Sequence, residues 1–257
     1  MPETVTAVLK TEDLGISFGG LKAVSDFNIE IFPGELMGLI GPNGAGKTTV
    51  FNLLTGVYKP TEGKIYLNGQ VVNGKKPYEM VAGGIARTFQ NIRLFGHMSV
   101  IDNVKVAFTK DTKYGLGASI LRTPGFWKRE RELDERAMEL LGIFKLQDKA
   151  ELMASALPYG QQRKLEIARA LATDMKVLLL DEPAAGMNPT ETAELLECIN
   201  IIRDRFGIAI LLIEHDMSLV MNVCRRLQVI NFGRTIASGL PQEVANDPGV
   251  IEAYLGQ

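Results

Sequence analysis

The nine residues GPNGAGKTT, Gly41 to Thr49, constrain the possible folds of this chain more than any other stretch. They follow an apolar run predicted to be a strand, Leu36 to Ile40, and they lead into a helix predicted from about Lys47 to Thr55. The pattern G-x-x-x-x-G-K-[ST] between a strand and a helix is typical of a loop whose backbone amides surround phosphate oxygens. The sequence therefore predicts a nucleotide site formed by Gly41, Pro42, Asn43, Gly44, Ala45, Gly46, Lys47, Thr48 and Thr49.

Side chains suited to a magnesium nucleotide occur in this loop and after a later strand. Lys47 can reach the β- and γ-phosphates, and the Thr48 hydroxyl can bind Mg²⁺. Asp181 and Glu182 follow the apolar run Val177 to Leu180, which is predicted to be a buried strand. Asp181 is placed to hold the Mg²⁺ shell, and Glu182 could orient or deprotonate an attacking water. An acidic first turn of the next helix would explain one such carboxylate, but it explains two less well.

Three further residues are predicted to lie near the nucleotide. His215 follows the apolar run Ile208 to Ile213, whose end should open on the same edge of the sheet. Gln90 ends a short predicted strand, where its amide oxygen could contact Mg²⁺ or water. Phe18 could stack on a nucleobase, although an isolated aromatic is more often part of a core. The chain has no N-K-x-D element for guanine, so adenine is favoured, and His97 is interpreted as structural.

Apolar strands that alternate with helices predict an α/β core with a mainly parallel sheet covered on both faces. Before the phosphate loop, residues 8–32 alternate as strands. After it, GKIYLNGQVV (Gly63 to Val72) is predicted to be a hairpin with a type I′ turn at Asn68-Gly69. The first part of the chain is therefore expected to add an N-terminal antiparallel β subdomain to the core.

A mainly helical segment, from about residue 91 to residue 172, interrupts this alternation. We expect a single domain over residues 1–257, in which residues 1–90 and 173–257 form the core and 91–172 an inserted helical subdomain. Within the insert, Ser99 is predicted to cap a helix, Lys128 to Leu141 to form a charged helix, and Thr109 to Phe126 to form a loop. After the insert, Asn188 and Pro189 predict the start of another helix.

The stretch LPYGQQRKLEIARALA, Leu157 to Ala172, is predicted to be an amphipathic helix from Gln161 onward. Its apolar positions include Leu165, Ala168 and Ala172, and its charged residues lie between them. Free amides at the start of a helix form an anion site. Because glycine carries no side chain, Gly160 would let another group approach the backbone there. The charged residues are Arg163, Lys164, Glu166 and Arg169.

The composition excludes several other classes of protein. The formal net charge is −2 over 257 residues, with a pI of about 5.8, so no global basic field argues for nucleic acid. Cys198 and Cys224 match no disulfide or zinc spacing. The apolar runs are strand-length, and Met1 to Lys10 lacks the apolar segment of a signal peptide. We therefore expect a cytoplasmic protein whose membrane role, if any, depends on a partner.

The order and spacing of these motifs resemble those of the ATP-binding cassette (ABC) ATPases over the whole chain. Under this resemblance the catalytic set is Lys47, Gln90, Glu182 and His215, and the metal set is Thr48, Gln90 and Asp181. Phe18 corresponds to the adenine-stacking aromatic, and Ala185 to Asn188 to the D-loop. The segment that corresponds to the signature motif comprises Leu157, Pro158, Tyr159, Gly160 and Gln161.

The resemblance also implies partners. Two ABC ATPase domains meet head to tail, and each signature helix caps the γ-phosphate held by the Walker A loop of the other. Closure of the dimer moves the helical insert, whose groove near Gln90 receives a short helix from a membrane permease. The implied cofactors are ATP and Mg²⁺, and the implied location is the inner face of the cell membrane.

Longer stretches are most similar to the ATPase subunits of branched-chain amino acid importers. They include RTFQNIRLF (Arg87 to Phe95), DEPAAGMNP (Asp181 to Pro189) and DPGVIEAYLGQ (Asp247 to Gln257). Importers of urea and amides remain the alternative. In either case an extracytoplasmic solute-binding protein is an indirect partner. Non-transport ABC ATPases usually carry long insertions or a second cassette, and a non-hydrolysing regulator would be expected to lack Glu182 or His215. An ABC exporter is the rival closest in mechanism.

The chain departs from the usual signature, Leu-Ser-Gly-Gly-Gln, at two positions. Pro158 and Tyr159 replace the serine and the first glycine, and Pro158 thereby removes a hydroxyl and an amide donor. Asn188 stands where the D-loop usually has aspartate. The partner is expected to be a second ABC ATPase subunit, in a homodimer or a heterodimer. The hypothesis is an asymmetric heterodimer, in which the site that Pro158 caps is the slower one.

Overall fold

The structure is a computed structural model that describes residues 6–110 and 124–255. The chain divides into two compact units. The sheet unit comprises Met1–Gln90, Lys176–Ala185 and Ile202–Gln257, and the helical unit comprises Asn91–Met175 and Gly186–Ile201. The sequence predicted that Gly186–Ile201, the second segment of the helical unit, would be part of the core. It joins the helical unit because its side chains pair there, as in the ion pair between Lys164 and Glu194.

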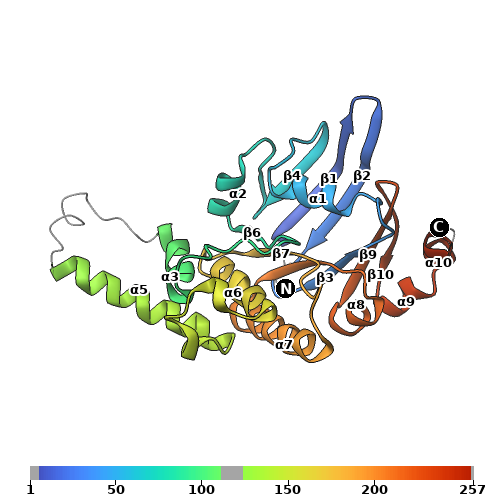
Figure 1. Cartoon of the computed structure of the whole chain (residues 1–257). Helices are drawn as coiled ribbons and strands as arrows, with labels where there is room; N and C mark the ends of the chain where they lie inside the picture. The colour runs from blue at the N-terminus through green and yellow to red at the C-terminus, as the bar shows by residue number, and fades with distance from the viewer. Residues whose placement is uncertain (1–5, 111–123, 256–257) are drawn as a thin grey trace, which may run out of the picture. The chain divides into compact units, whose positions relative to one another are not determined.

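A six-stranded sheet forms the centre of the sheet unit (Figure 1). Its neighbouring strands are parallel except for the antiparallel pair at one edge, β9 and β10, which confirms the prediction of a mainly parallel α/β core. In sheet order the strands are β10 (Arg234–Gly239), β9 (Arg226–Asn231), β3 (Leu36–Ile40), β8 (Ala209–Ile213), β7 (Val177–Asp181) and β6 (Ile85–Arg87).

The N-terminal strands form a separate four-stranded antiparallel sheet, as predicted. Asn68 and Gly69 join β4 to β5 with φ angles of 50° and 75°, the two positive values that a type I′ turn requires. The predicted hairpin is therefore confirmed. In sheet order these strands are β2 (Leu21–Ile31), β1 (Leu9–Phe18), β4 (Glu62–Leu67) and β5 (Gln70–Val71).

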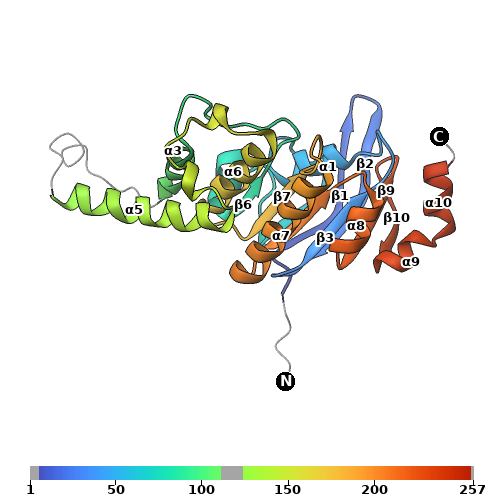
Figure 2. The same cartoon turned by 60° about the horizontal axis from the view of Figure 1, so that its bottom comes forward.

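Helix α1, Lys47–Leu54, joins the two sheets through one apolar core. Val50, Phe51 and Leu54 are fully buried in a cluster that also includes side chains from both sheets. The helix that begins in the phosphate loop is thus held firmly in place. Further helices of this unit are α2 (Pro77–Gly83), α8 (Met217–Val223), α9 (Pro241–Ala245) and α10 (Pro248–Leu255), and α10 lies beside β10 (Figure 2).

The helical unit contains α3 (Val100–Lys105), α5 (Pro124–Ile143), α6 (Tyr159–Leu171) and the first part of α7 (Pro189–Phe206). Among the described residues, short 3₁₀ helices also occur in this unit: η1 (Val106–Lys110), η2 (Gln147–Lys149) and η3 (Ala154–Ala156). Over the described ranges, no helix is both long and apolar enough to cross a membrane.

Two predicted boundaries in this unit are wrong. Helix α5 begins at Pro124, so Phe126 is helical rather than part of the predicted loop, whose residues 111–123 lie outside the described ranges. Helix α6 begins at Tyr159 rather than Gln161, with Pro158 as its N-cap. Proline is compatible with the edge of a helix because the first amides have no partner inside the helix.

The charged positions of α6 do not form the solvent-facing stripe expected of an amphipathic helix. Arg163, Lys164 and Glu166 are buried, and the Arg163 guanidinium lies 2.7 Å from the Glu166 carboxylate. Neighbouring elements cover this side of the helix as well, so its charges pair with carboxylates of α6 and α7 instead of with water. By contrast, Ser99 caps α3 by accepting the Asp102 amide, as predicted.

Candidate nucleotide-binding site

The backbone of the phosphate loop is shaped by close contacts with neighbouring strands. A methyl group in place of the Gly41 hydrogen would lie 2.0 Å from the Ile230 carbonyl oxygen, so only glycine fits beside β9. The Gly233 amide donates to the Ala45 carbonyl at 2.8 Å. Gly46, with φ of 106°, is the N-cap of α1 and supplies no side-chain cap. The loop therefore leaves the first amides of α1 without a side-chain cap, and such free amides form an anion site.

Lys47 carries the positive charge of this loop. Its ammonium group donates to the Gly41 carbonyl at 2.6 Å and to the Pro42 carbonyl at 2.9 Å. Burial lowers the pKa of Lys47, and the charges of Glu182 and Asp181 partly oppose this shift. A cation held by neutral carbonyls is well placed to receive an anionic ligand.

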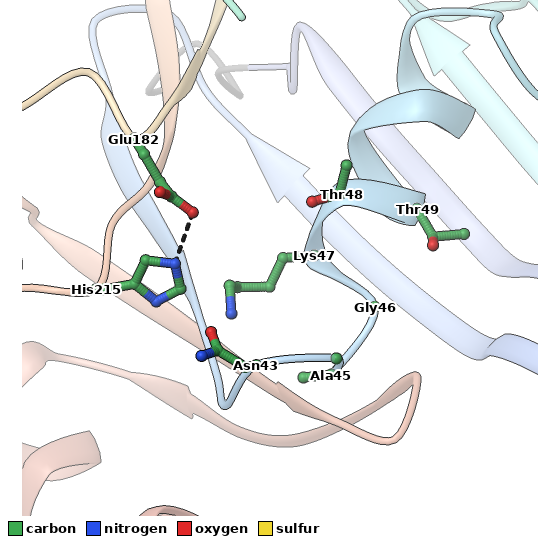
Figure 3. A pocket seen from close by; sticks show the side chains of 9 residues that line it. Asn43, Ala45, Gly46, Lys47, Thr48, Thr49, Glu182 and His215 are labelled. Carbon is green, nitrogen blue, oxygen red and sulfur yellow. Dashed lines mark hydrogen bonds and ion pairs between the residues drawn. The ribbon is translucent and has the colours of Figure 1, made fainter. Parts of the chain in front are cut away.

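A cavity of about 200 Å³ opens on the loop (Figure 3). Glu182 and His215 lie across it from the loop, so the structure brings together residues from three distant parts of the sequence. Each comes from the end of a parallel strand or from the loop after it, where ligands bind in sheets of this kind. The lining consists of Asn43, Gly44, Ala45, Gly46, Lys47, Thr48, Thr49, Glu182 and His215.

Glu182 is the centre of a hydrogen-bonded cluster. Its backbone has φ of 47°, an uncommon value for a residue other than glycine, and its amide donates to the Ile213 carbonyl at 2.9 Å. One carboxylate oxygen lies 2.6 Å from His215 Nε2, and the other accepts a hydrogen bond from the Gln90 amide at 3.2 Å. The structure thus connects all three residues that the sequence predicted separately, with Gln90 using its amide nitrogen for this contact.

The sequence analysis did not identify Glu214, which supports this cluster. Its buried carboxylate accepts the Ala184 amide at 2.9 Å and the His215 amide at 3.3 Å. Burial raises the pKa of Glu214, and the two amides oppose that shift. The carboxylate thereby ties the loop that carries His215 to the chain just after Glu182. Its position directly before His215 was the available signal.

Asp181 is buried at the end of β7, beside the Arg87 guanidinium at 2.7 Å. A carboxylate and the Thr48 hydroxyl are the hard oxygen donors that Mg²⁺ prefers, and Mg²⁺ usually takes one or two carboxylates together with substrate phosphates. Within residues 6–110 and 124–255, no group of three or more His, Cys, Asp or Glu could hold a metal. This donor set therefore fits Mg²⁺ bound with a nucleotide better than a metal held by protein alone.

The family model for ABC transporters matches residues 24–185, which contain the phosphate loop, Asp181 and Glu182. The chain belongs to the ABC transporter ATPases. A second model, for branched-chain amino acid ATP-binding cassette transporters, matches residues 234–257. As an ABC ATPase the chain binds and hydrolyses ATP.

Curated relatives and solved structures agree with this assignment over nearly the full length. The chain is 48% identical to the high-affinity branched-chain amino acid transport ATP-binding protein LivG of Escherichia coli (strain K12), over 97% of this chain and 98% of that protein. It is 44% identical to the corresponding protein BraF of Pseudomonas aeruginosa, over the same shares of the two chains. The crystal structure of the ADP conformation of MJ1267, an ATP-binding cassette, matches with a TM-score of 0.84 and 32% identity. That match covers 98% of this chain and 100% of the other.

The signature segment of this ABC ATPase lies in the helical unit. Pro158 caps α6 without a side-chain hydrogen bond, Leu157 is buried, and Tyr159 is half-exposed. Gln161 accepts a hydrogen bond from Lys149 at 2.9 Å. These contacts hold the start of α6, but no hydroxyl caps it.

The group that approaches Gly160 in this structure is a carboxylate of the same unit. A methyl group on Gly160 would lie 3.0 Å from Glu191 Oε1 and 3.2 Å from the end of Met187. Glu191 is held there by a capping box at the start of α7, because it exchanges hydrogen bonds with Asn188 at 3.0 Å in both directions. The helix start predicted at Asn188 is confirmed, whereas the closeness of Glu191 to Gly160 was not predicted.

Phe18 lies at the end of β1, outside the residues that line the cavity. Its ring is 46% exposed and packs edge-to-face against Tyr58, with 5.2 Å between centroids. It is therefore not a core aromatic, and its exposed surface is available to a ligand. Tyr58, which supports it, was not identified from the sequence.

Proposed function

We propose that this chain is the ATP-hydrolysing subunit of an importer for branched-chain amino acids. The observation that carries the proposal is 48% identity over 97% of the chain to a relative named as a high-affinity branched-chain amino acid transport ATP-binding protein. The match of residues 234–257 to the branched-chain family model supports it independently of the catalytic motifs.

In the proposed reaction, the loop amides and Lys47 bind the phosphates while Phe18 stacks on adenine. Thr48, Gln90 and Asp181 would hold Mg²⁺, which when bound would neutralise charge on the phosphates. Glu182 orients or deprotonates the attacking water, and His215 supports the γ-phosphate. The hydrogen bonds that join Glu182 to His215 and Gln90 support this assignment, because they bring the proposed base and its neighbours together.

The chain is proposed to work as half of a head-to-tail dimer with a second ABC ATPase subunit. Leu157 to Gln161 would then close the nucleotide site of the partner. Membrane permeases would receive the motion of the helical subdomain, proposed as residues 91–172 of a single domain over 1–257. The subunit would lie on the inner face of the cell membrane, held by the permeases, and a solute-binding protein would act from the other side.

The test is reconstitution of the ATPase with its permeases in vesicles, with ATP hydrolysis measured as binding protein is added. We expect binding protein loaded with leucine, isoleucine or valine to stimulate hydrolysis, and Glu182→Gln to abolish the stimulation. Stimulation by urea or short amides alone would replace the branched-chain assignment with the alternative importer. A chain that does not co-purify with any permease would contradict a transport function.

A further inference from the structure

Arg87 is a buried cation at the edge of the nucleotide site, and the motifs discussed above give it no role. It ends β6, three residues before Gln90. Its guanidinium donates to Asp181 Oδ2 at 2.7 Å and to Asn52 Oδ1 at 2.7 Å. Only 6% of the Arg87 side chain and 8% of the Asp181 side chain are exposed.

The surroundings hold the guanidinium in one place. Its central carbon lies 5.4 Å from the centroid of the Phe51 ring and 5.0 Å from that of the Phe89 ring. Its Nε is buried without a hydrogen-bond partner, which costs free energy. The two hydrogen bonds of its terminal nitrogens offset this cost. The planar guanidinium packs against both rings, so Arg87 is less mobile than an arginine on the surface.

One hydrogen-bond partner of Arg87 is a proposed metal ligand, and the other lies one helical turn from a proposed metal ligand. Asp181 is itself one of those ligands. Asn52 lies four residues after Thr48 on α1, and residues at this spacing share one face of a helix. Arg87 therefore connects the strand end that carries Asp181 to the helix turn next to Thr48. Because it occupies one Asp181 oxygen, it also determines which way the other oxygen points.

We propose that Arg87 is a positioning residue of the Mg²⁺ centre, which sets the spacing and orientation of Asp181 relative to Thr48. This inference rests on the proposed roles of Thr48 and Asp181 in binding Mg²⁺. Partners that orient metal ligands from outside the first coordination sphere commonly change metal affinity by about 10- to 100-fold when they are replaced. Lysine cannot substitute, because a single ammonium does not present two donors in the fixed fork that Asn52 and Asp181 require.

The experiment measures binding of a fluorescent ATP analogue to the full chain during a MgCl₂ titration, and again in EDTA. For Arg87→Lys and Arg87→Met we expect the Mg²⁺ concentration at half-maximal enhancement of binding to rise by about 10- to 100-fold. Binding in EDTA should be unchanged. If Arg87→Met does not fold, Asn52→Ala keeps the test available, with a smaller rise in the same direction.

Arg226→Met is the matched control. Arg226 pairs with Glu35 at 3.0 Å and lies over the Phe32 ring, but it begins β9, at the opposite ends of the parallel strands. Its loss should leave the Mg²⁺ titration unchanged.

Three results would overturn the proposal. Equal losses of binding with and without Mg²⁺ would assign Arg87 a general structural role. An unchanged or lower Mg²⁺ requirement in the Arg87 variants would mean that Arg87 merely neutralises Asp181. If Asp181→Asn also left the titration unchanged, the proposed metal ligands themselves would be wrong, and not only the role of Arg87.

Discussion

Helices α1 and α6 both begin at segments that the sequence predicted to meet a phosphate, but different groups lie against the two helix starts. Helix α1 begins at Gly46 and helix α6 at Pro158, and neither N-cap supplies a side-chain hydrogen bond. Around α1 the backbone itself makes the close contacts, as between Gly41 and Ile230. Around α6 charged side chains do so, with the Glu191 carboxylate over Gly160. Glycine spacing indicates the backbone turn at the start of α1, whereas nothing in the local sequence of α6 indicates that Glu191 lies against Gly160.

The largest effect is expected at the α1 site, from Glu182→Gln. We expect turnover of the assembled complex to fall about 10²- to 10⁴-fold, because the proposed base is lost while the phosphate contacts remain. Phosphate release and nucleotide binding should be measured on the same preparation. Glu243→Gln, a change in the capping box of α9, is the control and should leave both unchanged. Normal turnover in Glu182→Gln would mean that Glu182 is not the base.

The α6 region should be the more sensitive of the two to loss of a buried charge. Removing one partner of a buried ion pair costs about 3–5 kcal/mol, so Glu166→Gln should lower the free energy of unfolding by about that amount. Urea denaturation would measure the change. The control is Glu132→Gln, which breaks an exposed pair with Arg129 at the same i, i+3 spacing on α5. Equal effects of the two variants would show that burial of the α6 pair contributes nothing.

Pro158→Ser would make the α6 start more like a usual ABC signature. A charge-assisted hydrogen bond is worth about 1.5–3 kcal/mol, so the nucleotide site that this helix caps should turn over roughly ten- to a hundredfold faster. ATP hydrolysis must be measured in the assembled complex, with the other site inactivated. Unchanged hydrolysis would count against the asymmetric heterodimer.

The smallest effect is expected at the ion pair of Lys164 with Glu194, 2.6 Å apart, because the Glu194 side chain is 48% exposed and water screens the pair. The hydrogen bond from Lys164 lowers the pKa of Glu194. A carboxyl whose pKa is lowered by folding stabilises the folded state above its unfolded pKa, and this contribution disappears as the pH falls through the folded value. The melting temperature of Glu194→Gln should therefore lie slightly below that of the wild type at pH 7 and converge with it in acid. A difference that persists below both pKa values would assign the effect to something other than this charge.

Local patterns predicted much of the fold. The strand before Gly41, the type I′ turn at Asn68-Gly69 and the helix caps at Ser99 and Asn188 depend on neighbouring residues alone. The prediction that the charged residues of α6 face solvent was wrong, because spacing along a helix does not reveal which of its faces other elements cover. The starts of α5 and α6 were each placed a few residues late, since the first turn of a helix depends on packing as well as on capping.

The sequence by itself determined that this chain carries a phosphate loop, two carboxylates and a histidine at the ends of parallel strands. Glycine spacing and apolar runs specify such features within a few residues, because they reflect what the local backbone can adopt. Only the tertiary structure decided that Arg87 lies between Asn52 and Asp181, and that Glu191 lies over Gly160. Residues far apart in the chain make these contacts, so their geometry exists only once the sheets and helices have packed.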